Sequence, residues 1–141
     1  MRRAALGLTA LLALPAAASA DGGPSTVLVF EGLRASKGVV EVALFDREQA
    51  YAAGKGAVRT ARVPVSDRRV AVRFEGVEPG RYGVMAYHDI NGDGRLNLSL
   101  VGIPAEPYAF SNNAKGLPLA SWKAATFVAA GGPARQYIRL R

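Results

Sequence analysis

The stretch "RVAVRFEGVEPGRYGVMAYHD", Arg69 to Asp89, decides the fold class because it sets two strand patterns on either side of one tight turn. Its first third alternates apolar and charged residues, which is the period of a half-buried β-strand. Pro79 presets φ for a turn and Gly80 accepts positive φ, so the pair predicts a tight reversal. Tyr82 then enters the second strand. We expect its hydroxyl to hydrogen-bond back to the crossing loop, as buried tyrosines do at sandwich corners.

Five further segments have the composition of short strands bounded by Gly, Pro or Asp, namely residues 26–33, 38–46, 58–66, 125–130 and 134–141. Pro64 predicts that its strand, residues 58–66, lies at a sheet edge, since proline cannot donate to a central ladder. In the last strand we expect Ile138 and Leu140 to face inward. Only residues 47–56 favour a helical turn. These patterns predict an all-β fold: a single antiparallel β-sandwich of about seven strands, with a prealbumin- or Ig-like Greek key and one long irregular loop at 98–122.

The first twenty residues have the pattern of a secretory signal peptide. Two arginines precede an apolar run that is too short to span a bilayer, and Ala18-Ser19-Ala20 fits a cleavage site. We therefore expect a leader at 1–20, one domain at 21–141, no membrane span in the mature form, and a periplasmic or secreted protein. The chain has no cysteine, which excludes disulfides, thiol catalysis and cysteine-ligated metals.

The full chain of 141 residues has 18 basic and 11 acidic residues, a net charge of +7. The basic residues come singly or in pairs, with no basic run of the kind that marks a nucleic-acid patch. For an exported chain this excludes nucleic acid as the expected partner. The partner expected instead is an envelope or extracellular ligand, either a glycan or a protein.

The loop "HDINGDGRLN", residues 88–97, supports two interpretations. In the first it is a weak calcium site at 89–97, because Asp and Asn at alternate positions followed by Gly match the first half of a calcium loop. The candidate ligands are Asp89, Asn91, Asp93, Arg95 through its carbonyl, and Asn97. Leu100 stands where such loops carry a bidentate Glu, so Glu106 is the nearest carboxylate to complete the site. In the second interpretation Asn-Gly and Asp-Gly simply form a tight inter-strand turn.

His88 is the only histidine, so a multi-histidine zinc site is excluded. A small hydrolase centred on His88, with Ser99 or Ser111 as nucleophile, is the least favoured hypothesis because no nucleophile elbow is present. A histidine at the end of a strand more commonly anchors the following loop. We therefore predict that the protein is not an enzyme.

Residues 104–116 mix aromatic rings with amides, which is typical of carbohydrate-binding surfaces. The candidate ligand residues are His88, Tyr108, Phe110, Ser111, Asn112 and Asn113. The alternative is that the two rings pin a long loop to the sandwich and the two asparagines form its turn. Trp122 either closes one end of the core or contacts a ligand.

Four motifs occur in order: the Pro79-Gly80-x-Tyr82 turn, the loop His88-Asp89-x-Asn91-Gly92-x-Gly94, Gly102-Ile103-Pro104, and Phe110-Ser111-Asn112-Asn113. The first resembles a signature of transthyretin-like and collagen-adhesin B-type domains. Together the four resemble the bacterial domain-of-unknown-function 2141 family (DUF2141). The chain departs from that pattern at Asn97-Leu98, where the family more often has an acidic residue. The resemblance implies an exported β-sandwich and brings no activity with it. The function expected is a non-catalytic binding or interaction module of the cell envelope.

Overall fold

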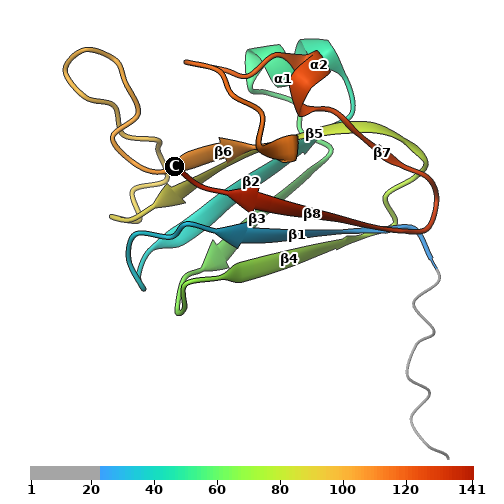
Figure 1. Ribbon diagram of the computed structural model, residues 1–141, viewed down its shortest axis with the longest axis horizontal. Helices are drawn as coiled ribbons and strands as arrows, with labels where there is room; N and C mark the ends of the chain where they lie inside the picture. Colours follow the sequence, from blue (N-terminus) through green and yellow to red (C-terminus); the bar gives the residue numbers. More distant parts are fainter. Residues whose placement is uncertain (1–22) are drawn as a thin grey trace, which may run out of the picture.

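Two β-sheets pack face to face in the computed structural model, which describes residues 23–141 (Figure 1). The leader predicted at 1–20 lies outside the described residues. The described chain forms eight strands, two short α-helices and one 3-10 turn. In chain order these are β1 Ser25–Glu31, β2 Val39–Phe45, α1 Glu48–Ala53, β3 Arg59–Pro64, β4 Val70–Glu75, β5 Gly80–Asp89, β6 Tyr108–Phe110, η1 Ser111–Asn113, α2 Trp122–Ala125, β7 Phe127–Ala129 and β8 Pro133–Arg139.

The smaller sheet has the strand order β4-β1-β8, and the larger one has the order β3-β2-β5-β6 with β7 pairing the start of β5. The all-β sandwich is confirmed, and β3 lies at a sheet edge as Pro64 required. One pairing differs from a wholly antiparallel arrangement, because β1 and β8 run parallel. Parallel neighbours need a long crossover between them. Here almost the entire chain separates the first strand from the last and supplies that crossover.

The long segment 98–122 is more ordered than the sequence predicts. Residues 97–105 form a short hairpin, closed by hydrogen bonds from Ala105 N to Asn97 O (2.8 Å) and from Ser99 N to Ile103 O (2.7 Å). The strand β6, the turn η1 and the helix α2 follow it. No helix in the described residues is long and apolar enough to cross a bilayer.

Two apolar clusters stabilise the sandwich. The first lies between the sheets and contains the inward side chains of β2 and β5 together with Ile138 and Leu140, both buried as predicted. The second lies on the outer face of the larger sheet, where Tyr51 of α1 and Ala125 of α2 pack with Phe45 and Phe110. Trp122 closes this second cluster against Tyr51, with ring centroids 5.4 Å apart.

Gly83 allows the second cluster to form. A Cβ at this position would lie 2.8 Å from Cζ3 of Trp122, closer than side-chain atoms pack. The absence of a side chain on this part of β5 therefore leaves the space that the indole ring fills. Near Gly83 both faces of β5 are consequently covered, one by the opposite sheet and the other by the helices.

Tyr82 forms the expected corner. Its hydroxyl donates to the carbonyl oxygen of Glu78 at 2.6 Å, and its side chain is buried beside Phe127. The hydrogen bond ties the Pro79-Gly80 turn to the start of β5.

Tyr82→Phe is expected to lower the free energy of unfolding by about 1–2 kcal/mol, because it removes one hydrogen bond and leaves the Glu78 carbonyl unpaired. Urea denaturation followed by circular dichroism measures the change. Tyr137→Phe is the matched control, since Tyr137 is exposed on β8. Equal midpoints for wild type and Tyr82→Phe would contradict a stabilising role for this bond.

Candidate ligand groove and the Asp89–Asn97 loop

A row of four side chains crosses the outer face of the larger sheet. The strand register places Glu41 of β2 opposite Arg62 of β3 and opposite Tyr87 of β5. Tyr87 in turn lies opposite Tyr108 of β6. Residues directly opposite on one face lie within contact distance. Two charged groups and two phenol rings therefore form a continuous line across the four strands.

A second, mostly apolar row runs beside the first, two residues further along each strand. It consists of Thr60, Ala43, Met85 and Phe110. Apart from Arg62, the residues of the two rows form the floor of a groove of about 390 Å³. Its walls are Leu96 from the loop after β5 and Pro118 and Leu119 from the segment before α2. The groove is large enough for a small organic ligand and is lined mainly by apolar and aromatic groups.

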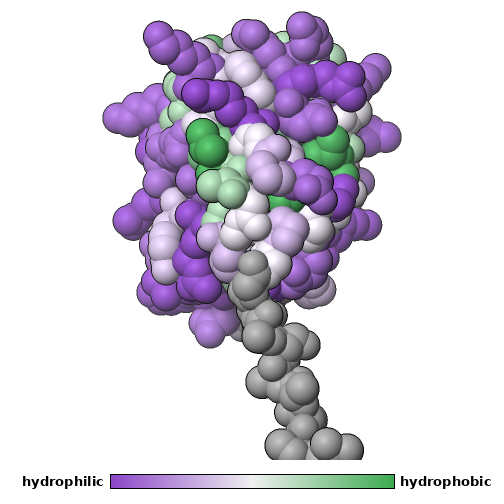
Figure 2. Space-filling model, turned by 90° about the vertical axis from the view of Figure 1, so that its right-hand side faces the viewer, coloured by the Kyte–Doolittle hydropathy of each residue, from purple (hydrophilic) through white to green (hydrophobic). Residues whose placement is uncertain are grey.

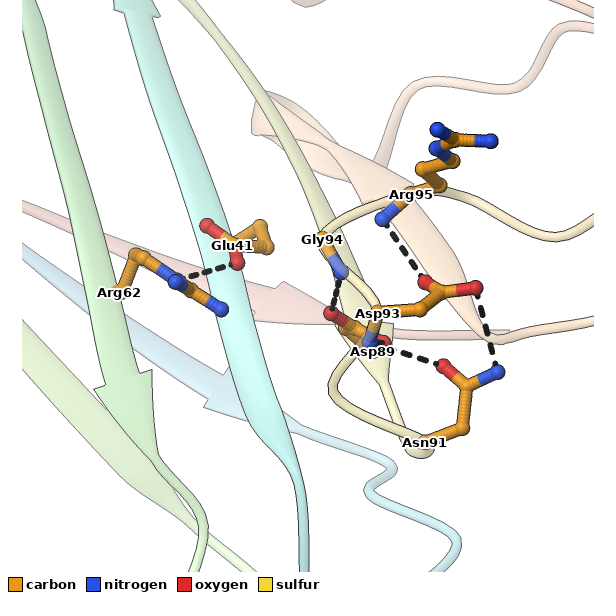
Figure 3. Close-up of polar contacts among 7 residues, drawn as sticks. All are labelled: Glu41, Arg62, Asp89, Asn91, Asp93, Gly94 and Arg95. Atoms are coloured by element: carbon orange, nitrogen blue, oxygen red, sulfur yellow. Dashed lines mark hydrogen bonds and ion pairs between the residues drawn. The ribbon is translucent and has the colours of Figure 1, made fainter.

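Nearby carboxylates affect Tyr87 on the groove floor. Burial is the largest cause that raises the pKa of Tyr87, to about 12, and the carboxylates of Glu41, Asp89, Glu106 and Asp93 add to it. Arg62 pairs with Glu41 at 2.6 Å (Figure 3).

Tyr87 is expected to ionise late in an alkaline titration. The absorbance difference between wild type and Tyr87→Phe should show one phenolate with a pKa of about 12 in the folded protein. In urea the same difference should show a pKa of about 10. The folded pKa lies above the unfolded pKa, so the unfolded state ionises first as the pH rises. The contribution of neutral Tyr87 to the free energy of unfolding is therefore fully present below about pH 10 and is lost as the pH rises towards 12. A folded-state pKa near 10 would show that Tyr87 is solvated.

The loop after β5 folds around the carboxylate of Asp89, which is fully buried. One oxygen of Asp89 accepts from Asp93 N at 3.2 Å, and the other accepts from Gly94 N at 2.7 Å (Figure 3). Both donors lie four or five residues downstream. Asp89 therefore closes the loop over four to five residues, and within it Asn91 and Asp93 form Asx turns by accepting from Asp93 N and Arg95 N.

Asp93 organises the exposed part of the same loop. Its carboxylate accepts from Asn97 Nδ2 (2.8 Å), from Arg95 N (2.9 Å) and from Asn91 Nδ2 (3.3 Å). These hydrogen bonds lower the pKa of Asp93, with the Asn97 amide contributing most. Two side-chain amides thus point N–H donors at the carboxylate oxygen that a calcium ion would need.

Glu106 contacts the Asp89–Asn97 loop, and its carboxylate is hydrogen-bonded to both ends of that loop. Its buried carboxylate accepts from Ile90 N and from Asn97 N, each at 3.0 Å. Within residues 23–141 no group of three or more His, Cys, Asp or Glu side chains is arranged to hold a metal ion. The contacts are those of a rigid turn, and the calcium interpretation stays a prediction that a binding measurement has to decide.

His88 lies on the opposite face of β5 from the groove and is fully buried. Its Nε2 is 2.8 Å from the carbonyl oxygen of Lys37, and its backbone N–H donates to Pro107 O, also at 2.8 Å. The ring thereby anchors the β1–β2 loop rather than the loop that follows it. In the described part of the chain its Nδ1 has no hydrogen-bond partner, and no serine or carboxylate is bonded to the ring.

The Ser111-Asn112-Asn113 turn fastens the two sheets together. The Ser111 hydroxyl accepts from Val84 N at 2.9 Å. The Asn113 side chain accepts from Arg139 N at 2.7 Å and donates to Tyr137 O at 3.1 Å, which satisfies the free edge of β8. Both asparagines have positive φ, a conformation that Asn tolerates.

The predicted ligand residues thus separate into two groups. Tyr108 and Phe110 line the groove. The other four use their polar groups within the protein: His88, Ser111, Asn112 and Asn113. The sequence analysis missed the rest of the groove, above all Glu41, Met85, Tyr87 and Leu96. A signal was present, because "VVEVALF" is apolar on both of its faces apart from Glu41, and such strands are covered on both sides.

The fold and the groove define a class of protein: an all-β sandwich with a ligand-sized groove on the outer face of one sheet. Within that class the chain belongs to the family described as "Uncharacterized protein conserved in bacteria (DUF2141)", whose model matches residues 28–136. The resemblance carried by the four motifs is confirmed. No curated protein and no solved structure matches the chain. Function therefore has to be argued from the groove and the loops around it.

Proposed function

We propose that the protein is a non-catalytic binding module of the cell envelope and that it holds a small ligand in the groove of the larger sheet. The observation that carries the proposal is the double row of outward side chains, from Arg62 to Tyr108 and from Thr60 to Phe110. Outward positions of a two-layer sandwich normally face solvent and are polar. Here five of the eight are aromatic or apolar, namely Ala43, Met85, Tyr87, Tyr108 and Phe110, and they line a concave surface, which is the character of a ligand site.

The ligand is a neutral or cationic molecule with an apolar body. Met85, Phe110 and Leu96 supply apolar contact area, and the surrounding carboxylates disfavour an anion. Glu41 and the Tyr87 hydroxyl are the polar groups available to orient it. His88 takes no part, because it lies on the other face of β5 and is buried.

A neutral oligosaccharide is the second candidate ligand. Tyr87 and Tyr108 are neighbours across two strands, so their rings form one surface on which a pyranose ring can stack. Glu41 and Thr60 add acceptors for sugar hydroxyls at the same groove. This arrangement transfers the carbohydrate hypothesis from the 104–116 loop to the sheet face.

The experiment compares a neutral apolar dye, N-phenyl-1-naphthylamine, with its anionic relative 1-anilinonaphthalene-8-sulfonate, followed by a glycan array. We expect the neutral dye to bind the wild type more tightly, and Met85→Glu to abolish that binding. Tyr137→Glu is the matched control on an exposed position of the other sheet. Equal binding of the wild type and Met85→Glu in both assays would exclude the groove. N-terminal sequencing of the exported protein tests the envelope location, with Asp21 expected as the first residue.

Calcium at about 1 mM is expected to shift the melting temperature of the wild type by less than about 1 °C, because the loop carboxylates already accept N–H donors. If the loop bound calcium with a Kd of about 10⁻⁴ M, the same concentration would stabilise the fold by about 1.4 kcal/mol. That corresponds to roughly 3–8 °C for a domain of this size. A shift in that range that Asp93→Asn removes would establish a calcium site at 89–97.

A further inference from the structure

The hairpin at residues 97–105 projects from the body of the sandwich. Figure 1 shows it, in orange, extending beyond the ends of the strands next to the C-terminus. A bridge pairs Leu98 with Pro104, and Gly102 N donates to Ser99 O at 2.9 Å to close the tip. The Ser99 hydroxyl also accepts from Ile103 N at 3.2 Å. The tip is therefore a folded element that presents its side chains in a defined arrangement.

The tip is apolar and faces solvent. Leu100 is 108% exposed and Val101 is 78% exposed, with Leu98 and Ile103 also largely exposed beside them. These four are the majority of the seven large exposed hydrophobic residues in the described chain. Burying such side chains away from water is favourable. A contiguous apolar tip of this kind indicates a surface that is covered by another molecule.

Basic side chains lie beside Tyr108, three residues after the hairpin, while the carboxylates of Asp93 and Glu106 accept hydrogen bonds from Asn97 at its base. Tyr108, which follows the hairpin, exchanges backbone hydrogen bonds with Arg141 at 3.1 Å in both directions. A pocket of about 360 Å³ beside Tyr108 is lined by the cationic side chains of Lys115, Arg139 and Arg141, with no Asp or Glu among its lining residues. An exposed apolar tip and a cluster of cationic side chains thus lie at the same end of the molecule. The side of the sandwich away from the hairpin, which faces the viewer in Figure 2, has a mainly hydrophilic rim.

We propose that the hairpin tip, residues 98–103, inserts into the interface of an anionic phospholipid bilayer, while Lys115, Arg139 and Arg141 bind the headgroup phosphates. A bilayer fits better than a protein partner because the tip is purely aliphatic. Protein interfaces are instead anchored by Trp, Tyr and Arg in central pockets. Aliphatic side chains flanked by cations are the combination that binds anionic membrane surfaces. The proposal is independent of the ligand in the groove.

The experiment is cosedimentation of residues 21–141, which contain every described element and lack the apolar leader, with two kinds of vesicle. One is phosphatidylcholine alone, and the other is phosphatidylcholine mixed with phosphatidylglycerol. We expect binding to the mixed vesicles that weakens in high salt. The double variant Leu100→Ser with Val101→Ser should bind at least about tenfold more weakly. Arg139→Gln with Arg141→Gln should also lose about tenfold on the mixed vesicles.

Val128→Ser is the matched control, because Val128 is an exposed apolar residue on β7 rather than on the hairpin. Circular dichroism establishes that each variant is folded. A Leu100→Trp variant adds a direct readout, a blue shift of its fluorescence on mixed vesicles that Val128→Trp does not give. Absence of binding by the wild type, or equal binding by the Leu100→Ser/Val101→Ser variant, overturns the proposal. Concentration-dependent dimerisation that this variant abolishes, without vesicle binding, would assign the tip to a second copy of the chain instead.

Discussion

Gly38→Ala is expected to lower the free energy of unfolding by about 3 kcal/mol or more. Gly38 has a φ of +78°, and a Cβ added there would lie 2.2 Å from the carbonyl oxygen of Asp89 and 2.8 Å from Cα of Ile90. The obstructing atoms belong to the backbone, so no side-chain rotation can relieve the clash. The methyl group would force the β1–β2 loop away from the end of β5.

Gly92→Ala is the matched control for this effect. Gly92 also has a positive φ, +71°, but a Cβ there would meet no atom within 4 Å. That substitution should cost only the conformational strain of about 1 kcal/mol. Urea denaturation of both variants distinguishes the cost of the backbone clash at Gly38 from the cost of a positive φ alone. Equal destabilisation of the two would show that the β1–β2 loop can move away without cost.

The same close approach explains the position of His88. Lys37, the residue before Gly38, provides the carbonyl oxygen that lies 2.8 Å from the imidazole Nε2. A displaced loop would leave a buried ring nitrogen without a partner, which adds to the cost of Gly38→Ala. The single histidine of the chain is thereby given a structural role in joining β5 to the β1–β2 loop.

Features that depend on near neighbours in the sequence could be predicted. The Tyr82 corner spans four residues, the helical turn of α1 begins close to where the pattern of residues 47–56 places it, and Ile138 and Leu140 alternate with exposed neighbours. Each follows from local periodicity or turn chemistry. Pro64 also located an edge strand without any knowledge of its partner.

The groove depends on register between distant strands and could not be predicted. Glu41 and Tyr87 are 46 positions apart in the chain, and only the β2–β5 pairing places them opposite one another. The β6 strand is three residues long, so its apolar pattern was too short to distinguish from a loop. The parallel pairing of β1 with β8 was missed for a similar reason. These are the first and last strands of the described chain, and no short connection between them fixes their relative direction.

The Asp89–Asn97 loop shows a different limit. A calcium loop and an Asx turn use the same residues, because both need short oxygen-bearing side chains and glycines. Sequence spacing brought Asp89, Asp93 and Glu106 to one loop, and the structure places them there. The sequence could not indicate whether those oxygens face a cation or backbone N–H groups. The answer depends on the path of the loop backbone, which directs its N–H groups towards the carboxylates.

Asp89→Ala is expected to lower the free energy of unfolding by about 3 kcal/mol, since hydrogen bonds to a charged acceptor are worth about 1.5–3 kcal/mol each and Asp89 accepts two. The loss should loosen the loop, and the Leu96 side chain with it, so the groove loses one wall. Hydrogen exchange of the Gly94 amide and urea denaturation measure the two consequences.

Asp89→Asn and Asp93→Ala make this prediction specific. Asn retains one acceptor of the same shape, so it should cost clearly less than Ala at position 89. Asp93→Ala should cost much less than Asp89→Ala because Asp93 is exposed and water can replace its partners. If the loop were organised by a cation instead, the order would differ: Asp89→Asn, Asp89→Ala and Asp93→Ala would be destabilised alike in calcium, and the differences from wild type would shrink in chelator. The rank order of three unfolding free energies, measured with and without calcium, therefore separates a turn closed by N–H donors from a loop closed by an ion.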